Sequence, residues 1–191
     1  MINAELGHVK TLKEFNKEIR RQQEEAHGND YCQIHDAITK YMKECKSYME
    51  LGTHQGGTAS AAMLAKPNRV FLVDMDMSRY NKFLAPIAQE WCDKYDIELI
   101  VKEADSTSIG TINMTDMLVI DSYHHPDHMT KELNLHGSNV RKYILAHDTS
   151  VVNGKPNESL YNCMKRFADN NGWEVIERGT TNVGYTVLKK K

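Results

Sequence analysis

Apolar residues recur along this chain with two different periods. Near the start, Leu12, Phe15 and Ile19 are spaced as on one face of a helix, among lysine, glutamate and arginine. This spacing predicts an amphipathic helix over residues 10–26. A second apolar stripe of the same period predicts another helix between residues 34 and 45.

From residue 47 onward, short apolar runs alternate with helical patterns. The run RVFLV at residues 69–73 is typical of a strand whose two faces are both buried. Regular alternation of strands and helices indicates a doubly wound, parallel sheet. The predicted strands are 47–50, 69–73, 97–102, 117–120, 142–146, 173–178 and 185–189, and the predicted helices between them are 58–65, 78–95, 128–135 and 160–170.

The last two predicted strands flank Gly179 and Gly184, which predicts a C-terminal antiparallel hairpin. We therefore expect an α/β fold with a Rossmann-like, doubly wound and mostly parallel seven-stranded sheet, in which only the last strand is antiparallel. The length of 191 residues suits one domain, with N-terminal helices over 1–46 and the Rossmann-like core over 47–191.

Two local features complete this prediction. The polar stretch from Asp148 to Ser159 is the one long loop that we expect, and it follows a strand end, where such folds bind ligands. Ser78 is the candidate N-cap of the helix over residues 78–95.

Composition narrows the class of protein. The 24 basic and 26 acidic residues give a formal net charge of −2, so no nucleic-acid partner is indicated. No apolar run reaches about 20 residues, so no membrane span and no signal peptide are expected. The 4 cysteines form no C-x-x-C pair and are expected to be buried, reduced thiols of a cytoplasmic protein. The sequence does not decide whether the chain forms a homo-oligomer.

The first candidate binding segment is YMELGTHQGGT, residues 48–58, between a predicted strand and a predicted helix. Gly52 allows a sharp turn, and the glycine pair Gly56 and Gly57 allows the backbone to approach a ligand closely. The segment lacks the G-x-G-x-x-G of dinucleotide sites and the lysine of a P-loop. A carboxylate at Glu50 suits a ligand that carries an ammonium and a sulfonium. The alternative is a plain turn from strand to helix.

Two acidic residues at later strand ends extend this site. Asp74 lies 22 positions after Gly52 and is suited to accept hydrogen bonds from both ribose hydroxyls of an adenosine ligand, with Asp76 as the alternative. Asp105 follows the third predicted strand and could accept a hydrogen bond from the adenine amino group. The other interpretation of Asp105 is a polar surface turn.

These features, in this order, resemble the class I methyltransferases that use S-adenosylmethionine. The resemblance extends from about residue 31 to the C-terminal hairpin VIERGTTNVGYTVLKK. It implies that S-adenosyl-L-methionine is the cofactor. The residues expected to bind it are Glu50, Gly52, Thr53, Gly56, Thr58, Asp74, Asp105 and Asp121.

Candidate metal ligands follow the fourth and fifth predicted strands. Asp121 ends one strand, while His147 and Asp148 end the next, and adjacent parallel strands bring such residues together. The segments ELGTHQGGTASA, IDSYHHPDHMTKEL and YILAHDT resemble cephalosporin-hydroxylase-like, macrocin-type and catechol-type O-methyltransferases. That resemblance implies Mg²⁺ or another divalent cation at Asp121 and Asp148. His147 departs from it, because imidazole suits softer metals than Mg²⁺.

His124 lies three positions after Asp121, where the catechol-type enzymes carry a general base. Histidine can serve there because its pKa lies near neutrality. The alternatives are a role beside the metal and an inert loop histidine. The expected function is O-methylation of a small hydroxylated acceptor, which the sequence does not identify. The other hypotheses are a metal-independent S-adenosylmethionine enzyme with another acceptor and a non-catalytic, Rossmann-like binding subunit.

Overall fold

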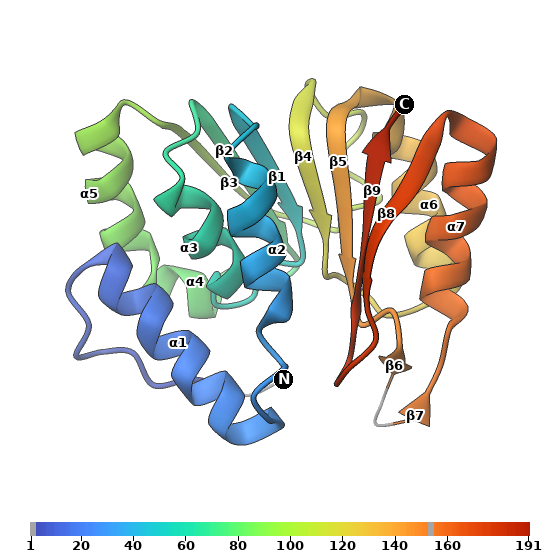
Figure 1. Ribbon diagram of the computed structural model, residues 1–191. Helices are drawn as coiled ribbons and strands as arrows, with labels where there is room; N and C mark the ends of the chain where they lie inside the picture. The colour runs from blue at the N-terminus through green and yellow to red at the C-terminus, as the bar shows by residue number, and fades with distance from the viewer. Residues whose placement is uncertain (1–2, 153–154) are drawn as a thin grey trace.

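A seven-stranded sheet organises the molecule (Figure 1). The computed structural model of the chain describes residues 3–152 and 155–191. From one edge of the sheet to the other, the strands are β3 (Glu98–Glu103), β2 (Arg69–Asp74), β1 (Ser47–Leu51), β4 (Thr115–Ile120), β5 (Val140–His147), β9 (Tyr185–Lys190) and β8 (Trp173–Gly179).

The predicted strand directions are confirmed. Neighbouring strands from β3 to β5 pair in parallel, whereas β9 pairs antiparallel with both β5 and β8. The strand β8 therefore runs parallel to the others, and β9 alone is reversed. The predicted C-terminal hairpin also forms, since Trp173 pairs with Lys190 and Gly179 with Tyr185.

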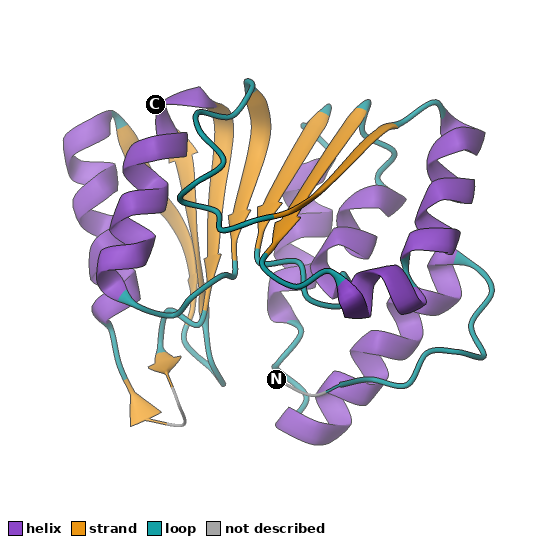
Figure 2. Cartoon of the chain, turned by 180° about the vertical axis from the view of Figure 1, so that it is seen from behind, coloured by secondary structure: helices purple, strands orange, loops and turns teal. Residues whose placement is uncertain are grey.

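Helices cover both faces of the sheet (Figures 1 and 2). Side chains of five helices share one hydrophobic cluster on the first face, and these helices are α1 (Leu12–His27), α2 (Gln33–Met42), α3 (Gly57–Leu64), α4 (Ser78–Phe83) and α5 (Ala85–Tyr95). The second cluster contains side chains of α6 (Pro126–His136) and α7 (Ser159–Asn171). A short 3₁₀ helix, Gly137–Asn139, follows α6.

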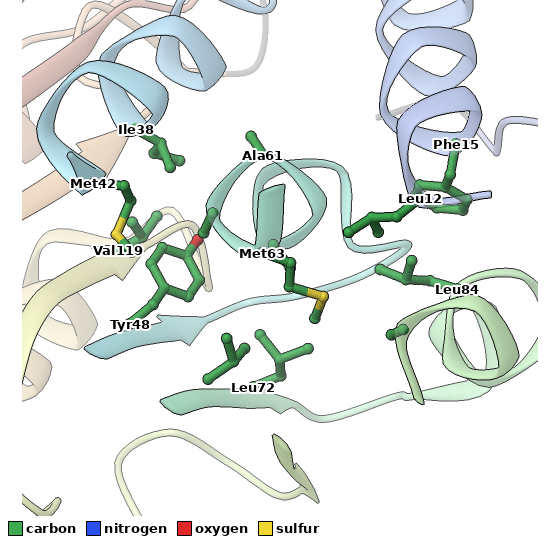
Figure 3. Close-up of a cluster of buried hydrophobic side chains, with 14 of the residues drawn as sticks. Leu12, Phe15, Ile38, Met42, Tyr48, Ala61, Met63, Leu72, Leu84 and Val119 are labelled. Carbon is green, nitrogen blue, oxygen red and sulfur yellow. The ribbon is translucent and has the colours of Figure 1, made fainter. Parts of the chain in front are cut away.

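Alternation along the strands explains why their sequences are apolar at nearly every position. In β1, Tyr48 belongs to the first cluster, while Met49 and Leu51 belong to the second. Successive side chains of a strand point to opposite faces, so a strand covered on both faces needs apolar residues at successive positions. Figure 3 shows Tyr48 in the first cluster together with Met42 of α2 and Val119 of β4.

The predicted helix over residues 78–95 is wrong in one respect, because it is two helices. The chain breaks at Leu84, and Pro86 lies in the first turn of α5. Proline has no amide hydrogen and clashes with the carbonyl group four residues earlier, so an uninterrupted helix is disfavoured there. Ser78 is not the N-cap either: Met77 holds that position, and the Asp76 carboxylate accepts a hydrogen bond from the Ser78 amide.

The stretch from 148 to 159 is also more ordered than a plain loop. It contains a two-stranded antiparallel ladder of β6 (Val151–Val152) and β7 (Lys155–Pro156). Residues 153 and 154 lie outside the described residues. Among the helices of residues 3–152 and 155–191, none combines the length and the apolar character that crossing a membrane requires.

Candidate functional site

The main cavity of the site lies at the carboxyl ends of β1, β2, β3 and β4. Its volume is about 300 Å³. In doubly wound folds, this edge of the sheet is where ligands bind. The lining residues come from the ends of these four strands, the loops that follow them and the first turn of α6. They are Gly52, His54, Val73, Asp74, Met75, Ala104, Asp105, Ser106, Asp121, Ser122, Tyr123 and His128.

Gly52 is required by the close approach of two loops. Its φ is +91°, and a Cβ atom there would lie 2.1 Å from the Asp121 carbonyl oxygen. Any side chain at this position would therefore force the ends of β1 and β4 apart. The glycine brings Asp121 beside the β1 loop, in addition to allowing the predicted turn.

The glycine pair that follows serves helix packing. Gly56, with φ at +81°, faces Leu84, whose Cδ2 would lie 2.3 Å from an added Cβ. A Cβ atom added at Gly57 would lie 3.2 Å from Cε1 of the His35 ring. Gly56 does not line the main cavity, so the structure gives it a role in seating α3 against its neighbours.

Asp74 lies at the cavity wall and ties two strand ends together. One carboxylate oxygen accepts a hydrogen bond from the His54 amide at 2.6 Å, and the other accepts one from the Asp76 amide at 3.0 Å. Asp76 is exposed and does not line the cavity. Of the two acidic candidates for ribose recognition, only Asp74 lines the main cavity.

Asp105 forms a turn and also lies at the cavity wall. Its Oδ1 accepts hydrogen bonds from the Thr107 amide at 2.8 Å and the Thr107 hydroxyl at 2.9 Å, which lower the pKa of the Asp105 carboxyl. It thus forms a turn, and it also lines the main cavity.

Glu50, on β1, is fully buried. The hydroxyl of Thr58 donates a hydrogen bond to Glu50 Oε1, and no other described group hydrogen-bonds Oε2. Burial raises the pKa of Glu50 to about 8. The side chain is therefore mostly protonated at neutral pH, and it lines neither the main cavity nor its smaller neighbour.

The smaller neighbouring cavity lies between the β1 loop and the N-terminal helices. Its volume is about 30 Å³, compared with about 300 Å³ for the main cavity. Thr53, Thr58 and His147 are among its lining residues, and Tyr31 and His35 close it from the helical side. Gly52, His54 and Asp121 line both cavities, so the two cavities meet beside these residues.

Three titratable side chains, those of His124, His147 and Asp148, lie beside the Asp121 carboxylate. His124 Nε2 lies 3.4 Å from Asp121 Oδ1 and 3.0 Å from Asp148 Oδ2. His147 Nδ1 lies 3.3 Å and 3.4 Å from the same two oxygens. The potential ligand atoms of Asp121, His124 and Asp148 all lie within 4.8 Å of one another. The sequence placed His147 with the carboxylates, and the structure adds His124 to them.

The carboxyl and imidazole groups of this cluster shift the pKa values of one another. Burial alone would raise the pKa of Asp121, but the imidazoles of His147 and His124 hold it well below its ordinary value. Burial alone would lower the pKa of His147, but Asp121 raises it to about 9. Asp148 has a φ of +55°, which costs backbone energy of the kind often found at functional sites.

A buried network behind the cavity was missed at the level of sequence. Glu132 of α6 accepts hydrogen bonds from the hydroxyls of Ser106 and Ser122, the second at 2.6 Å, and its Oε1 lies 3.3 Å from His128 Nε2. The two serines belong to different loops of the cavity wall. One signal existed: Glu132 occupies a position on the buried stripe of α6, between Met129 and His136.

Comparisons with known proteins show the fold. No family model and no curated protein sequence matches the chain. Among solved structures, it is similar to a caffeoyl-CoA O-methyltransferase from Staphylococcus aureus, with a TM-score of 0.63, 12% identity and coverage of 91% of both chains. It is also similar to an O-methyltransferase from Bacillus cereus in complex with S-adenosylhomocysteine, with a TM-score of 0.57, 14% identity and coverage of 96% of this chain and 93% of that one.

The chain has the fold of class I methyltransferases. A third similar structure is an RNA methyltransferase from Pyrococcus horikoshii, with a TM-score of 0.56, 11% identity and coverage of 85% of this chain and 82% of that one. Because the shared fold carries both O-methyltransferases and RNA methyltransferases, it does not by itself select an acceptor.

Proposed function

We propose that the chain binds S-adenosylmethionine in the main cavity and methylates a hydroxyl group of a small acceptor. The observation that carries this proposal is the arrangement of acidic groups around about 300 Å³ of space. Asp74 and Asp105 lie on the β2 and β3 side, and Asp121 lies on the β4 side. On the methyltransferase fold, this order matches ribose, adenine and methyl donor.

The residues present fit that cofactor. Asp74 is held by two backbone amides and faces the cavity, so its carboxylate is oriented to accept hydrogen bonds from ribose hydroxyls. Met75 and Ala104 supply apolar wall for a base, and Asp105 lies beside them. When bound, S-adenosylmethionine supplies a methyl group that its sulfonium has already activated.

Little chemical work is then left to the protein. Alignment of the acceptor oxygen can contribute up to about 7–11 kcal/mol of barrier lowering. His124 is the member of the four-residue cluster that an acceptor can reach most easily, since its side chain is 31% exposed and that of His147 is 6% exposed. We propose that the His124 imidazole takes the proton of the acceptor hydroxyl, and that the carboxylates of Asp121 and Asp148 beside its Nε2 stabilise the imidazolium that forms.

The residues do not fit Mg²⁺, the cation of the resembled enzymes. Mg²⁺ prefers oxygen ligands in a near-ideal octahedron. Here two imidazole nitrogens, from His124 and His147, point at the same carboxylate oxygens. The proposed proton transfer therefore uses no step through Mg²⁺.

A small acceptor is favoured over RNA by charge. The formal net charge is −2, with 24 basic against 26 acidic residues. The main cavity is moreover rimmed by Asp74, Asp105 and Asp121, whose carboxylates would repel a phosphate backbone.

Isothermal titration with S-adenosylhomocysteine tests the cofactor site. The wild-type protein should bind it, and NAD should bind far more weakly. Asp74→Ala should weaken binding by about 1–3 kcal/mol, because charge-assisted hydrogen bonds to the ribose are lost. Asp76→Ala is the matched control, since Asp76 lies two residues away and outside the cavity, and it should leave the affinity unchanged.

Methyl transfer itself can be followed as release of S-adenosylhomocysteine from S-adenosylmethionine. Small phenols and catechols should be tested beside structured RNA. Turnover of a hydroxylated small molecule that falls in His124→Gln supports the proposal. Turnover of RNA alone, or equal affinity for the cofactor in Asp74→Ala and wild type, contradicts it.

A further inference from the structure

We propose that the segment before α1, residues 4–9, is a strap that holds the loop after β1, residues 52–56, in the shape that cofactor binding requires. Gln55 is the positioning residue through which this strap acts on the cofactor loop. Its role rests on the proposed function, which supplies the ligand, whereas the contacts described below exist in the free protein.

The strap has buried side chains although it forms no regular helix or strand. Ala4 and Leu6 are each 1% exposed, and both belong to the first hydrophobic cluster together with Val9. Backbone amide and carbonyl groups that are removed from water need hydrogen-bond partners, and an irregular segment has no helix or ladder that supplies them. The partners of the strap must therefore come from neighbouring elements.

Two glutamine side chains supply these partners. Gln55 Oε1 accepts a hydrogen bond from the Ala4 amide at 2.8 Å, and Gln55 Nε2 donates one to the Ala4 carbonyl at 2.9 Å. Gln22 of α1 makes the same pair of hydrogen bonds with Glu5, at 2.9 Å and 3.0 Å. A side-chain amide carries both donors and an acceptor, so it can satisfy both backbone groups of one residue. The strap is thus bound by the cofactor loop on one side and by α1 on the other.

The cofactor loop needs an anchor because part of its backbone is unfavourable. His54 has a φ of +47°, in the left-handed region that residues with a Cβ atom seldom adopt. Contacts around the loop must hold this conformation. Gln55 is the next residue, is 2% exposed, and does not line the main cavity. It therefore anchors the loop from outside that cavity.

The anchored loop in turn orients the proposed ribose acceptor. The His54 amide donates a hydrogen bond to the Asp74 carboxylate at 2.6 Å. The helix α4, which follows β2, is tied to the same strap residue, because Arg79 Nη2 donates a hydrogen bond to the Ala4 carbonyl at 2.8 Å. Ala4 thus links the segments that follow β1 and β2, on both sides of Asp74. We expect loss of the Gln55 contact to act on the ligand through Asp74.

Gln55→Leu tests the strap in the free protein, because leucine is similar in size and cannot make the two hydrogen bonds to Ala4. Hydrogen exchange, followed by mass spectrometry without ligand, should become about 10-fold faster in the cofactor loop. Gln33→Leu is the matched control, since Gln33 donates its hydrogen bond to Thr181, and it should leave this exchange unchanged. Wild-type protection of the cofactor loop in Gln55→Leu would overturn the proposal.

Gln22→Leu is a second variant that leaves the cofactor loop itself intact. Gln22 is only half-buried, so its replacement is less disruptive to folding than that of Gln55. It releases Glu5 from α1 and should also speed exchange in the cofactor loop, by about 3-fold. If exchange speeds up in the strap alone, the strap does not hold the loop. Far-ultraviolet circular dichroism checks that each variant is folded.

A double-mutant cycle tests whether Gln55 acts through Asp74. Gln55→Leu should raise the Kd of S-adenosylhomocysteine by about 10-fold when Asp74 is present. In the Asp74→Ala background, the same change should raise the Kd by less than about 2-fold, because the carboxylate that the loop orients is absent. A purely structural role would give the same factor in both backgrounds, and that result would contradict the positioning role.

The outcomes also separate the strap from the proposed function. If the wild-type protein does not bind S-adenosylhomocysteine while Gln55→Leu still loosens the cofactor loop, the proposed function is contradicted and the strap is supported. If the wild-type protein binds this ligand and Gln55→Leu changes neither exchange nor affinity, only the strap inference is contradicted.

Discussion

The two halves of the candidate site hold their carboxylates in different ways. Over β2 and β3, Asp74 and Asp105 accept hydrogen bonds from backbone amides of nearby turns. Over β4 and β5, Asp121 and Asp148 meet the imidazoles of His124 and His147. Backbone amides are fixed in place and uncharged, so the first half is suited to hold a ligand in one orientation. Imidazoles can gain or lose a proton, so the second half is suited to proton transfer.

Gly52 joins the two halves, and its substitution should have the largest effect. Gly52→Ala places a Cβ atom 2.1 Å from the Asp121 carbonyl oxygen and keeps a φ of +91°. We expect a loss of about 4 kcal/mol in the free energy of unfolding, together with loss of cofactor binding. Urea denaturation and titration with S-adenosylhomocysteine measure the two effects.

Gly110→Ala is the matched control for that substitution. Gly110 has a φ of +75°, but nothing lies within 4 Å of its added Cβ. Only backbone strain should appear, at about 1–2 kcal/mol. If the two variants lose the same stability, the loops do not depend on their contact at Gly52.

Glu50 is fully buried in β1 and should make stability depend on pH. Its folded-state pKa of about 8 lies above the ordinary value of 4.5, so the folded chain keeps this proton after the unfolded chain has lost it. The Glu50 contribution to stability is therefore fully present below pH 4.5 and is lost as the pH rises toward 8. The slope is about 1.4 kcal/mol per pH unit.

Glu50→Gln removes this dependence, because an amide does not titrate there. Urea denaturation from pH 5 to pH 8 should show the variant gaining on the wild type as the pH rises. Parallel curves for the two proteins would show that Glu50 ionises in the folded state at its ordinary pKa.

Glu132 tests whether the cavity wall depends on a buried network, and its effect should be the smallest. Glu132→Ala leaves Ser106 and Ser122 without their shared acceptor, so two loops of the wall lose a common anchor. We expect affinity for S-adenosylhomocysteine to fall about 10-fold, or about 1.4 kcal/mol. Asp127→Asn, an exposed position on the same helix, should not change it. Equal affinities for Glu132→Ala and wild type would make the network a packing feature only.

The parts of the fold that depend on local pattern could be predicted from the sequence. The strand and helix periods predicted the sheet and the reversed direction of β9. Strands that are buried on both faces have apolar residues at successive positions, which makes them visible in the sequence. The break at Leu84 was missed because a continuous apolar stripe hid the effect of Pro86.

Some features of the candidate site could likewise be predicted from local sequence, and others could not. The positions of Asp74 and Asp105 follow from their strand ends, which spacing reveals. The packing of Gly56 against Leu84, and the capture of two distant serines by Glu132, depend on contacts between segments far apart in the chain. His124 joined the metal-ligand candidates for the same reason, since its distance to Asp148 is set by two loops together.

A crystal structure of the complex with S-adenosylhomocysteine tests the central claim most directly. The account predicts adenine beside Asp105, ribose hydroxyls on the Asp74 carboxylate, and the sulfur atom directed toward Asp121 at the junction of the two cavities. A ligand bound elsewhere, or a cavity at β1 to β4 that stays empty at saturating ligand, would contradict it.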